Sequence, residues 1–353
     1  MPYFHKKVVR VSRFSPSSGF NNCVYIVKRK DVSHISLKEP AAVIIRKYGG
    51  RVISETSAKK DLRPITQMEE LLVVHGLSRQ KLMPRLIGLF EGGRVEEFIE
   101  CRAITGPEAI DPVIMPDLAK NLALIHALRM PMPNPGYNFI DVLWTNWNKY
   151  VSENPDRASD EHDFGKELTW LQPLLHHDHH RIVFINWDPH FSNVSLRTNP
   201  KEGELRTIIF DFEMAGYNMR GKDLGLLLLA IGSSLAVGGK EELMIKFEFP
   251  DRDICFKFFE LYLKECEKDF TDIDRNGIDS NDHLLVESLI GAMVSSLCYL
   301  FVHMRSHEQF QNNDGELLEK MTAMETNIRS SYFLCKRLLH EWFPDYKKIL
   351  KCD

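Results

Sequence analysis

The sequence has little of what marks secreted, membrane-spanning or nucleic-acid-binding proteins. Its formal net charge is only −4 over 353 residues, so no strong overall field attracts nucleic acid. Its seven cysteines are odd in number, scattered and never spaced C-x-x-C, which favours reduced thiols in the cytoplasm over disulfides or a cysteine zinc site. The first residues, MPYFHKKVVRVSRF, are basic but lack the apolar core of about 7–15 residues that a secretory signal requires.

Long apolar runs are also scarce. The longest, Leu224–Val237, is interrupted by glycine and serine and is shorter than the roughly 20 residues that span a bilayer. We therefore predict a buried helix there and no transmembrane segment. The composition, 44% apolar and 27% charged, is that of an ordinary globular protein.

The length and the order of the local patterns predict two lobes in an α+β protein, because 353 residues exceed one small core. The first part alternates β-branched residues, contains one helical stretch and has two strands joined by a glycine turn. The second part is mainly helical, with one pair of short strands in its middle. We expect a β-rich N-terminal lobe over residues 1–103 and a mainly helical lobe over residues 104–353. The segments behind this prediction are strands from Cys23 and Ala41, a helix over Gln67–His75, and a turn at Gly92-Gly93.

The most informative stretch is FINWDPHFSN, which runs from Phe184 to Asn193 between two short apolar strands. It places Asp188 five residues before Asn193, and Asp211 ends the strand TIIFDF eighteen residues further on. Phosphoryl transfer needs a base or orienting group at the acceptor hydroxyl and hard oxygen ligands for Mg²⁺. Asp188 fits the first role, and Asn193 and Asp211 fit the second. The alternative is a plain surface turn, because Asp before proline often forms one.

Further motifs lie in the order found in one family. The run FDFEMAGYNMRGKDLG, Phe210–Gly225, resembles the choline and ethanolamine kinase family, in which D-F-E, Y-N, R-G and D-hydrophobe-G follow one another. The segments VIIRKYGG, GRVEEFIECRAI, LALIHALRMP and SSGFNN resemble the family's phosphate-side strand, hinge, helix end and nucleotide-covering turn. The resemblance extends from about Ser17 to about Phe301. Within the family, the sequence resembles a diverged choline kinase of the B type found in nematodes.

The resemblance implies a two-lobed protein-kinase-like fold of the aminoglycoside phosphotransferase and choline kinase type, with ATP and Mg²⁺ between the lobes. It implies phosphorylation of choline, the first step of the CDP-choline route to phosphatidylcholine, and a possible homodimer. It makes Asp188 the catalytic base or orienting acid, with Glu213 beside the metal. Its other implied roles are Mg²⁺ ligands at Asn193 and Asp211, ATP contacts at Asn22, Arg46, Glu97, Phe98 and Ile99, an acidic partner of Arg46 at Glu70 or Glu69, and loop-bracing residues at Asn218, Arg220 and Asp223.

Two departures from the family pattern bear on activity. Asn186 stands where the family has a histidine that supports the loop but does not move the proton. The rings that would hold a quaternary ammonium are depleted, because Met214 and Cys298 replace aromatic residues. The substrate contacts that we expect to remain are Tyr217, Tyr299 and Phe301, with Trp187 as a new ring.

These departures leave three functions open: a choline kinase, a kinase for ethanolamine or another small amino alcohol, and a nucleotide-binding pseudokinase or partner subunit. A depleted aromatic cage suits ethanolamine, whose primary ammonium donates hydrogen bonds to carboxylates. Individual residues also have structural alternatives. Tyr299 and Phe301 could be core residues of an apolar helix, and Arg46 could be a surface charge on a strand edge.

Two metal-binding patterns are rejected from the sequence. The loop Asp272–His283 begins like an EF-hand, but His283 stands at the twelfth position, where a calcium site needs a bidentate Glu. The run HHDHH, His176–His180, contains ligand residue types, but adjacent side chains point in different directions and rarely enclose one ion. We therefore expect a hydrated surface at this run.

Overall fold

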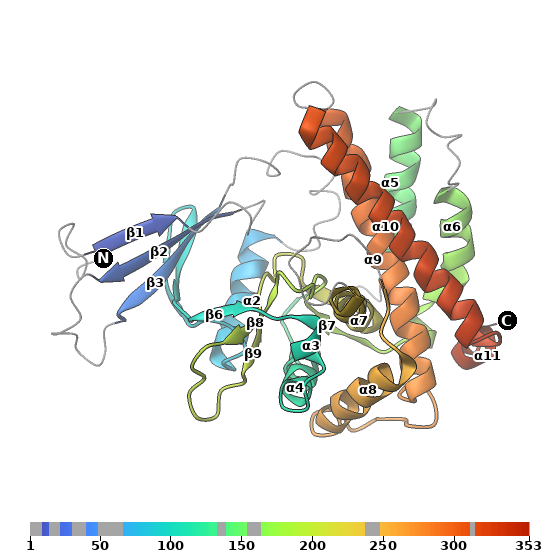
Figure 1. Cartoon of the computed structure of the whole chain (residues 1–353), viewed down its shortest axis with the longest axis horizontal. Helices are drawn as coiled ribbons and strands as arrows, with labels where there is room; N and C mark the ends of the chain where they lie inside the picture. The colour runs from blue at the N-terminus through green and yellow to red at the C-terminus, as the bar shows by residue number, and fades with distance from the viewer. Residues whose placement is uncertain are drawn as a thin grey trace.

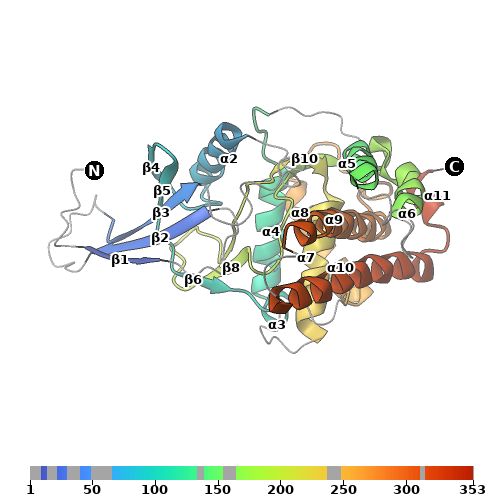
Figure 2. The same cartoon turned by 90° about the horizontal axis from the view of Figure 1, so that it is seen from above.

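The computed structural model describes residues 9–13, 22–29, 40–48, 66–132, 139–153, 164–236, 248–310 and 315–352. Figure 1 shows a small, strand-rich part at the N-terminal end and a larger part made mainly of helices. Seen from above in Figure 2, strands β1–β5 lie apart from the long helices α9 and α10. This order, a β-rich region followed by a mostly helical one, confirms the predicted fold class.

The N-terminal part is a five-stranded antiparallel sheet in the order β1-β2-β3-β5-β4, with one helix beside it. In β3, Arg46 lies opposite Val24 of β2 and Arg94 of β5. The tight turn between β4 and β5 contains Gly92 with a φ of 77°, a conformation that glycine adopts without strain, as the sequence predicted. The elements are β1 (Val9–Arg13), β2 (Asn22–Arg29), β3 (Ala42–Tyr48), α2 (Gln67–Arg79), β4 (Leu86–Phe90) and β5 (Gly93–Glu97).

The second part contains two small sheets instead of the single strand pair that the sequence predicted. Strand β7 pairs with β10, whereas β8 lies between β6 and β9. The strands on either side of FINWDPHFSN therefore belong to different sheets, and the prediction that they form one pair was wrong. Their partners arrive from distant parts of the chain, which local patterns do not show. The strands are β6 (Cys101–Ala103), β7 (Ile182–Ile185), β8 (Val194–Arg197), β9 (Thr207–Ile209) and β10 (Gly216–Met219).

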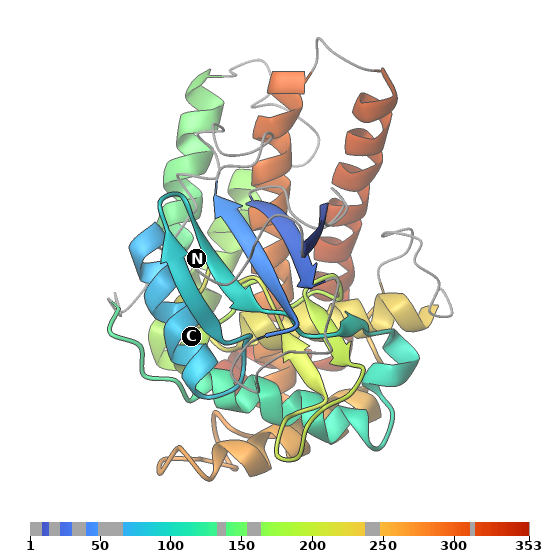
Figure 3. The same cartoon turned by 90° about the vertical axis from the view of Figure 1, so that its left-hand side faces the viewer.

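Helices form the rest of the second part, and α9 contacts both α7 and α10. Viewed from the side of the N-terminal sheet, Figure 3 shows α5, α9 and α10 standing behind the strands. The helical elements are α3 (Gly106–Ala109), α4 (Ile114–His126), α5 (Phe139–Glu153), α6 (Phe164–Leu171), η3 (Gln172–Leu175), η4 (His177–His179), α7 (Gly221–Ala236), α8 (Arg252–Cys266), α9 (Asn281–Phe310), α10 (Gly315–Trp342) and α11 (Tyr346–Leu350).

Helices α7 and α9 approach each other through glycines. A Cβ on Gly225 would lie 2.0 Å from the Ser288 carbonyl oxygen, and one on Gly291 would lie 2.0 Å from the Gly221 carbonyl oxygen. A larger residue at either position would push the two helix backbones apart. Helix α7 contains most of the longest apolar run and lies in the core, which confirms the predicted buried helix.

One stretch of the described residues is long and apolar enough to cross a membrane, namely Asn281–Phe301 of α9. Inside the protein 94% of that stretch is buried. The core helix of a globular protein meets the same criterion of length and composition, so this feature is weak evidence for a membrane span.

Candidate active site

A buried carboxylate supports the base of the loop over residues 186–193, which we call the Asp188 loop. Asp223, in the first turn of α7, accepts hydrogen bonds from the backbone N–H of Asn186 at 2.7 Å and of Trp187 at 2.8 Å. The Nε2 of His126 lies 3.4 Å from the same carboxylate. Hydrogen bonds to a charged acceptor are stronger than neutral ones, so they fix the backbone just before Asp188. This is the bracing role that the resemblance implies for Asp223.

Asn186 joins the Asp188 loop to the segment that carries the second acidic residue. Its amide Nδ2 donates to the backbone carbonyls of Phe210 and Asp211, both at 3.2 Å. Its Oδ1 accepts a hydrogen bond from the backbone N–H of Asp188 at 3.1 Å. The asparagine thus uses both ends of its amide to hold the two acidic segments together. A side chain at this position supports the loop without being a histidine.

Two residues of the site have a left-handed backbone. The φ angle is 84° at Trp187 and 60° at Asp211. Such angles are uncommon for residues other than glycine and cost about 1–3 kcal/mol, so they persist only where the surroundings impose them. The strain therefore lies directly before Asp188 and at Asp211, where the resemblance places the chemistry.

The Asp188 carboxylate is contacted from two sides. The Tyr299 hydroxyl of α9 donates a hydrogen bond to Asp188 Oδ1, and the His190 Nε2 lies 3.4 Å from the same oxygen. Burial and then the Asp188 charge raise the pKa of Tyr299 well above its usual value, so the phenol keeps its proton. Burial alone would lower the pKa of His190, but the Asp188 and Asp211 carboxylates raise it. Tyr299 therefore contacts Asp188, and its role as a substrate contact stays a prediction.

Asn193 and Asp211 lie at the facing ends of β8 and β9. The backbone N–H of Phe210 donates to the Asn193 carbonyl at 2.8 Å, which places Asp211 one residue from that contact. The Asn193 Nδ2 donates to the Asp188 carbonyl at 2.9 Å, so its Oδ1 is the part of the amide suited to a cation. An amide oxygen and a carboxylate are the hard donors that Mg²⁺ prefers, so these residues fit the predicted ion.

Lys222 is a residue of the site that the sequence reasoning missed. It is 1% exposed, and its Nζ lies 3.0 Å from the centroid of the Trp187 ring. Burial lowers the pKa of Lys222 to about 8, although Cys298, Asp223 and Asp188 act in the opposite direction. The signal in the sequence was a lysine at the start of a mainly apolar helix. The Lys222 ammonium therefore covers a face of the Trp187 ring, which was expected from the sequence to contact the substrate.

The N-terminal sheet carries a buried ion-pair network. Arg94 forms ion pairs with Glu70 at 2.7 Å and with Glu96 at 2.5 Å, and all three residues are buried. The Arg46 Nε lies 3.8 Å from the other oxygen of Glu96. The Glu70 contact that the structure gives is thus with Arg94, where the resemblance implies Arg46. Sequence reasoning missed Arg94, which lies opposite Arg46 in the neighbouring strand.

The choice between Glu69 and Glu70 follows from the start of α2. The Thr66 Oγ1 accepts a hydrogen bond from the Glu69 backbone N–H, and the Glu69 Oε2 accepts one from the Thr66 backbone N–H at 2.5 Å. This reciprocal capping box occupies Glu69 at the helix end. Glu70 faces inward and is 3% exposed, so it is the residue that joins the ion-pair network.

The other predicted nucleotide contacts lie where the two parts join. Glu97 ends β5, and Phe98 and Ile99 lead from the N-terminal sheet to β6 of the second part. The Lys28 Nζ lies 4.7 Å from the centroid of the Phe98 ring. The predicted turn over residues 17–21 and the side chain of Asn22 lie outside the described residues.

The remaining predicted site residues, Glu213, Tyr217 and Phe301, differ in burial and in their contacts. Glu213 is half-buried and lies two positions after Asp211. The Tyr217 hydroxyl accepts a hydrogen bond from the Met130 backbone N–H at 2.8 Å and lies 3.1 Å from its carbonyl oxygen. Phe301 is fully buried in the hydrophobic core, which agrees with the alternative that it is a core residue of an apolar helix.

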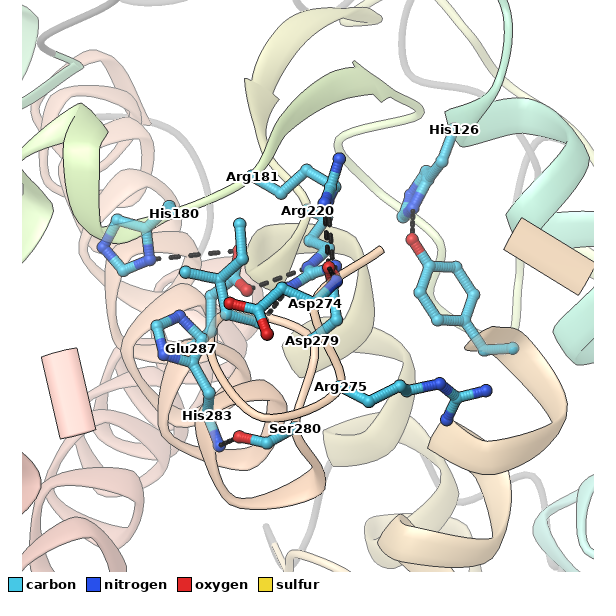
Figure 4. Close-up of polar contacts among 12 residues, drawn as sticks. His126, His180, Arg181, Arg220, Asp274, Arg275, Asp279, Ser280, His283 and Glu287 are labelled. Atoms are coloured by element: carbon cyan, nitrogen blue, oxygen red, sulfur yellow. Dashed lines mark hydrogen bonds and ion pairs between the residues drawn. The ribbon is translucent and has the colours of Figure 1, made fainter. Parts of the chain in front are cut away.

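Two residues of the YNMRG run have structural contacts. The Asn218 Oδ1 accepts a hydrogen bond from the neighbouring Met219 N–H at 2.8 Å. Arg220 is fully buried and forms ion pairs with Asp279 and Glu287, which link the start of α7 to α9 and to the loop before it (Figure 4).

Comparisons with known proteins agree with this arrangement. A family model described as choline/ethanolamine kinase matches residues 15–324. The chain is 26% identical over 242 residues to choline kinase alpha of Mus musculus, covering 63% of this chain and 52% of that protein. It is 26% identical over 197 residues to ethanolamine kinase 1 of Homo sapiens, covering 52% of this chain and 40% of that protein. The chain spans about half the length of the curated relatives it matches.

A solved structure of choline kinase from Cryptosporidium parvum superimposes with a TM-score of 0.69 at 16% identity, covering 99% of this chain and 95% of that chain. At this identity the likeness shows the fold, which is shared with aminoglycoside phosphotransferases. The family model covers most of the chain, and the matched residues include the Asp188 loop and Asp211. The chain therefore belongs to the choline/ethanolamine kinase family.

Proposed function

We propose that this protein transfers the γ-phosphoryl group of ATP to the hydroxyl of choline, the step that begins the CDP-choline route to phosphatidylcholine. The observation that carries the proposal is the arrangement of Asp188, Asn193 and Asp211. Asn186 joins the backbones of Asp188 and Asp211, the Asn193 amide donates to the Asp188 carbonyl, and Asp223 braces the base of the loop. Membership of the choline/ethanolamine kinase family supports a small amino alcohol as the acceptor.

In this proposal Asp188 accepts a hydrogen bond from the acceptor hydroxyl and orients it toward the phosphate. Asn193 and Asp211 would hold Mg²⁺, which would supply neutralisation of charge on the phosphate oxygens, and Glu213 would assist at the metal. Arg46 would bind the phosphates, and Glu97, Phe98 and Ile99 would present backbone to adenine. A homologous structure contains bound AMP, which supports a nucleotide site in this fold.

Ethanolamine is the second candidate acceptor, because two of the four rings expected to contact the substrate do not offer a free face. The face of Trp187 is covered by the Lys222 ammonium, and Phe301 belongs to the core. A quaternary ammonium depends on such faces, at about 0.5–2 kcal/mol each, whereas a primary ammonium can donate to carboxylates. This observation favours ethanolamine over choline.

A nucleotide-binding protein without catalysis is the third candidate. It is favoured by the hydrogen bond between Tyr299 and Asp188, which uses an oxygen that the acceptor hydroxyl would need. It is disfavoured by the survival of Asp188, Asn193, Asp211 and Glu213 together, because a chain without turnover has no physical need for all four.

We propose that the reaction takes place in the cytoplasm. The support is that all seven cysteines are free thiols, which suits a reducing compartment.

Within the family we propose a diverged choline kinase of the B type found in nematodes. We also propose a homodimer as the assembly to be tested.

A substrate panel tests the proposal. The full chain is incubated with Mg²⁺, γ-labelled ATP and choline, ethanolamine or their partly methylated intermediates, each alone and in competition. Labelled phosphocholine with the highest kcat/KM supports the proposal, and a higher value for ethanolamine selects the second candidate. Binding of Mg-ATP without labelled product from any amino alcohol would select the third.

A further inference from the structure

Three buried side chains from two distant segments meet beside the strand that leads to the Asp188 loop. His180 lies just before β7, and His283 and Glu287 lie four residues apart on one face of α9. One ring nitrogen of each histidine and one Glu287 oxygen lie within 4.8 Å of one another. Figure 4 shows this cluster beside Arg220, with the contact of His180 to Glu287 as a dashed line. The exposed fractions are 6%, 2% and 0%.

The tautomer of His180 follows from its hydrogen bond. Its Nε2 lies 2.7 Å from the Leu174 carbonyl oxygen, and a carbonyl only accepts, so Nε2 carries the proton. Nδ1 then holds a lone pair, and the Nδ1 atom lies 3.9 Å from the Glu287 Oε1. Burial lowers the pKa of His180 to about 4, which disfavours a second proton on Nδ1. Two acceptors thus face each other in a buried site, an arrangement that a cation between them would satisfy.

His283 has a similar orientation. Its Nδ1 lies 3.4 Å from the Ile349 carbonyl oxygen, and burial lowers its pKa. Among the described residues, neither the His180 Nδ1 nor the His283 Nε2 has a hydrogen-bond partner of normal geometry, although the backbone of His179 also acts on His283 and raises its pKa. Metal-binding histidines characteristically direct one ring N–H at a carbonyl and leave the other nitrogen for the ion. His180 meets this condition through Leu174, and His283 meets it through Ile349.

The Glu287 carboxylate is itself held in place. The Arg220 Nε donates to its Oε2 at 2.9 Å, and the Gly221 backbone N–H donates to its Oε1 at 3.2 Å. These contacts fix the carboxylate but use only part of its capacity, because an ionised carboxylate has about four lone-pair sites. Oε1 therefore remains able to bind a cation on the side that faces His180.

The charges around the cluster also favour a cation. Two arginines, Arg181 and Arg220, are in ion pairs with three carboxylates, Asp272, Asp279 and Glu287. Two positive and three negative charges leave a net charge of −1. A divalent ion would change this local sum to +1, so neither state isolates a large uncompensated charge in the interior.

We propose that His180, His283 and Glu287 bind one zinc ion that ties the start of β7 to α9. Two imidazoles and a carboxylate suit Zn²⁺, whereas Mg²⁺ and Ca²⁺ prefer oxygen ligands throughout. In tetrahedral zinc sites with bonds of about 2.0–2.1 Å, ligand atoms lie about 3.3–3.4 Å apart, so the three side chains close around the ion by about 1.5 Å. The fourth position is left for water.

The site draws on the two motifs that the sequence appeared to exclude. His180 ends the run HHDHH, and His283 is the residue that spoils the EF-hand pattern. The prediction of a hydrated surface was wrong for His180, because the chain turns inward there to begin β7. Each motif supplies one histidine, and the fold brings the two together.

Zinc titration of the full chain tests the proposal, without reference to any enzymatic activity. The protein is stripped with a chelator, and Zn²⁺ binding is measured by competition with a chromophoric chelator. We expect one ion per chain and binding about 100-fold or more weaker in His180→Gln and in His283→Gln. Glutamine keeps a donor for the carbonyl that each ring contacts. His176→Gln is the matched control, because His176 is exposed in the same run, and it should bind zinc as the wild type does.

A second measurement covers the case in which the buried variants do not fold. X-ray absorption at the zinc edge of the wild-type protein should show two imidazole ligands and oxygen in the first shell. A stoichiometry below one ion per chain, a first shell containing sulfur, or loss of binding in His176→Gln would overturn the proposal. Equal affinity in the wild type and a folded His283→Gln variant would overturn it as well.

Discussion

Replacing Lys222 with methionine is expected to stabilise the protein, although it removes a charge close to Asp188 and Asp223. Methionine has similar length, no charge and an adaptable side chain. Burial lowers the pKa of the Lys222 amine from its ordinary value of 10.5 to about 8. Each pKa unit is worth about 1.4 kcal/mol, so keeping the ammonium in the folded protein costs about 3 kcal/mol at pH 7. The variant should gain a large part of this amount.

The gain must depend on pH in a defined direction. Between pH 8 and pH 10.5 the unfolded chain holds a proton on Lys222 that the folded chain has released. The wild type therefore gains stability relative to the variant as pH rises through this window. The difference in unfolding free energy between the variant and the wild type should be largest below pH 8 and close to zero near pH 10.5.

Urea unfolding at pH 7 and at pH 10 measures both effects. In thermal unfolding, where the unfolding entropy is about 2.1 cal/mol/K per residue, a gain of about 3 kcal/mol corresponds to a rise of about 4 °C in Tm. Lys257→Met on the exposed face of α8 is the matched control and should show no such pH dependence. A Lys222→Met variant less stable than the wild type by more than about 1 kcal/mol at pH 7 would refute the reasoning. The contacts of the ammonium with Trp187 and the carboxylates would then outweigh its desolvation.

Three further changes have defined outcomes. Gly225→Ala places a Cβ against the Ser288 carbonyl, so urea unfolding should show a loss of about 3 kcal/mol, and an unchanged free energy would mean that α7 and α9 separate easily. Arg94→Met removes the guanidinium that two buried carboxylates share, and thermal and urea unfolding should show a loss of about 3–5 kcal/mol. Tyr299→Phe keeps the ring but removes the hydroxyl that competes for Asp188, so steady-state kinetics should show a roughly tenfold lower KM for the amino alcohol with kcat retained. A higher KM would mean that this hydroxyl contacts the acceptor.

Local patterns predicted the parts of the site that are close in sequence. The spacing of Asp188 and Asn193 is set by one loop, and the turn at Gly92 needs only glycine's access to positive φ. The start of α2 at Gln67, which the helical spacing predicted, is fixed in the structure by the capping box of Thr66 and Glu69. In each case the physical cause lies within a few residues, so a single sequence displays it.

Contacts between distant segments were not predictable in the same way. Lys222 covers the Trp187 ring, although nothing in either local pattern predicts this contact. Strand β7 pairs with β10 more than thirty residues later, and local alternation gives no register for such a pair. His180 and His283 come from motifs that each fail alone, and only the fold brings them into one cluster.

A comparison of the wild type with Asp188→Asn, which preserves the shape of the side chain and removes its charge, tests the proposed phosphoryl transfer. Both proteins are assayed for phosphocholine and phosphoethanolamine formation, and their Mg-ATP binding is measured by calorimetry. We expect product from the wild type, a loss of kcat of about 10²- to 10⁴-fold in the variant, and nearly unchanged Mg-ATP affinity. Wild-type turnover in Asp188→Asn, or no product from the wild type with either alcohol, would contradict the proposal.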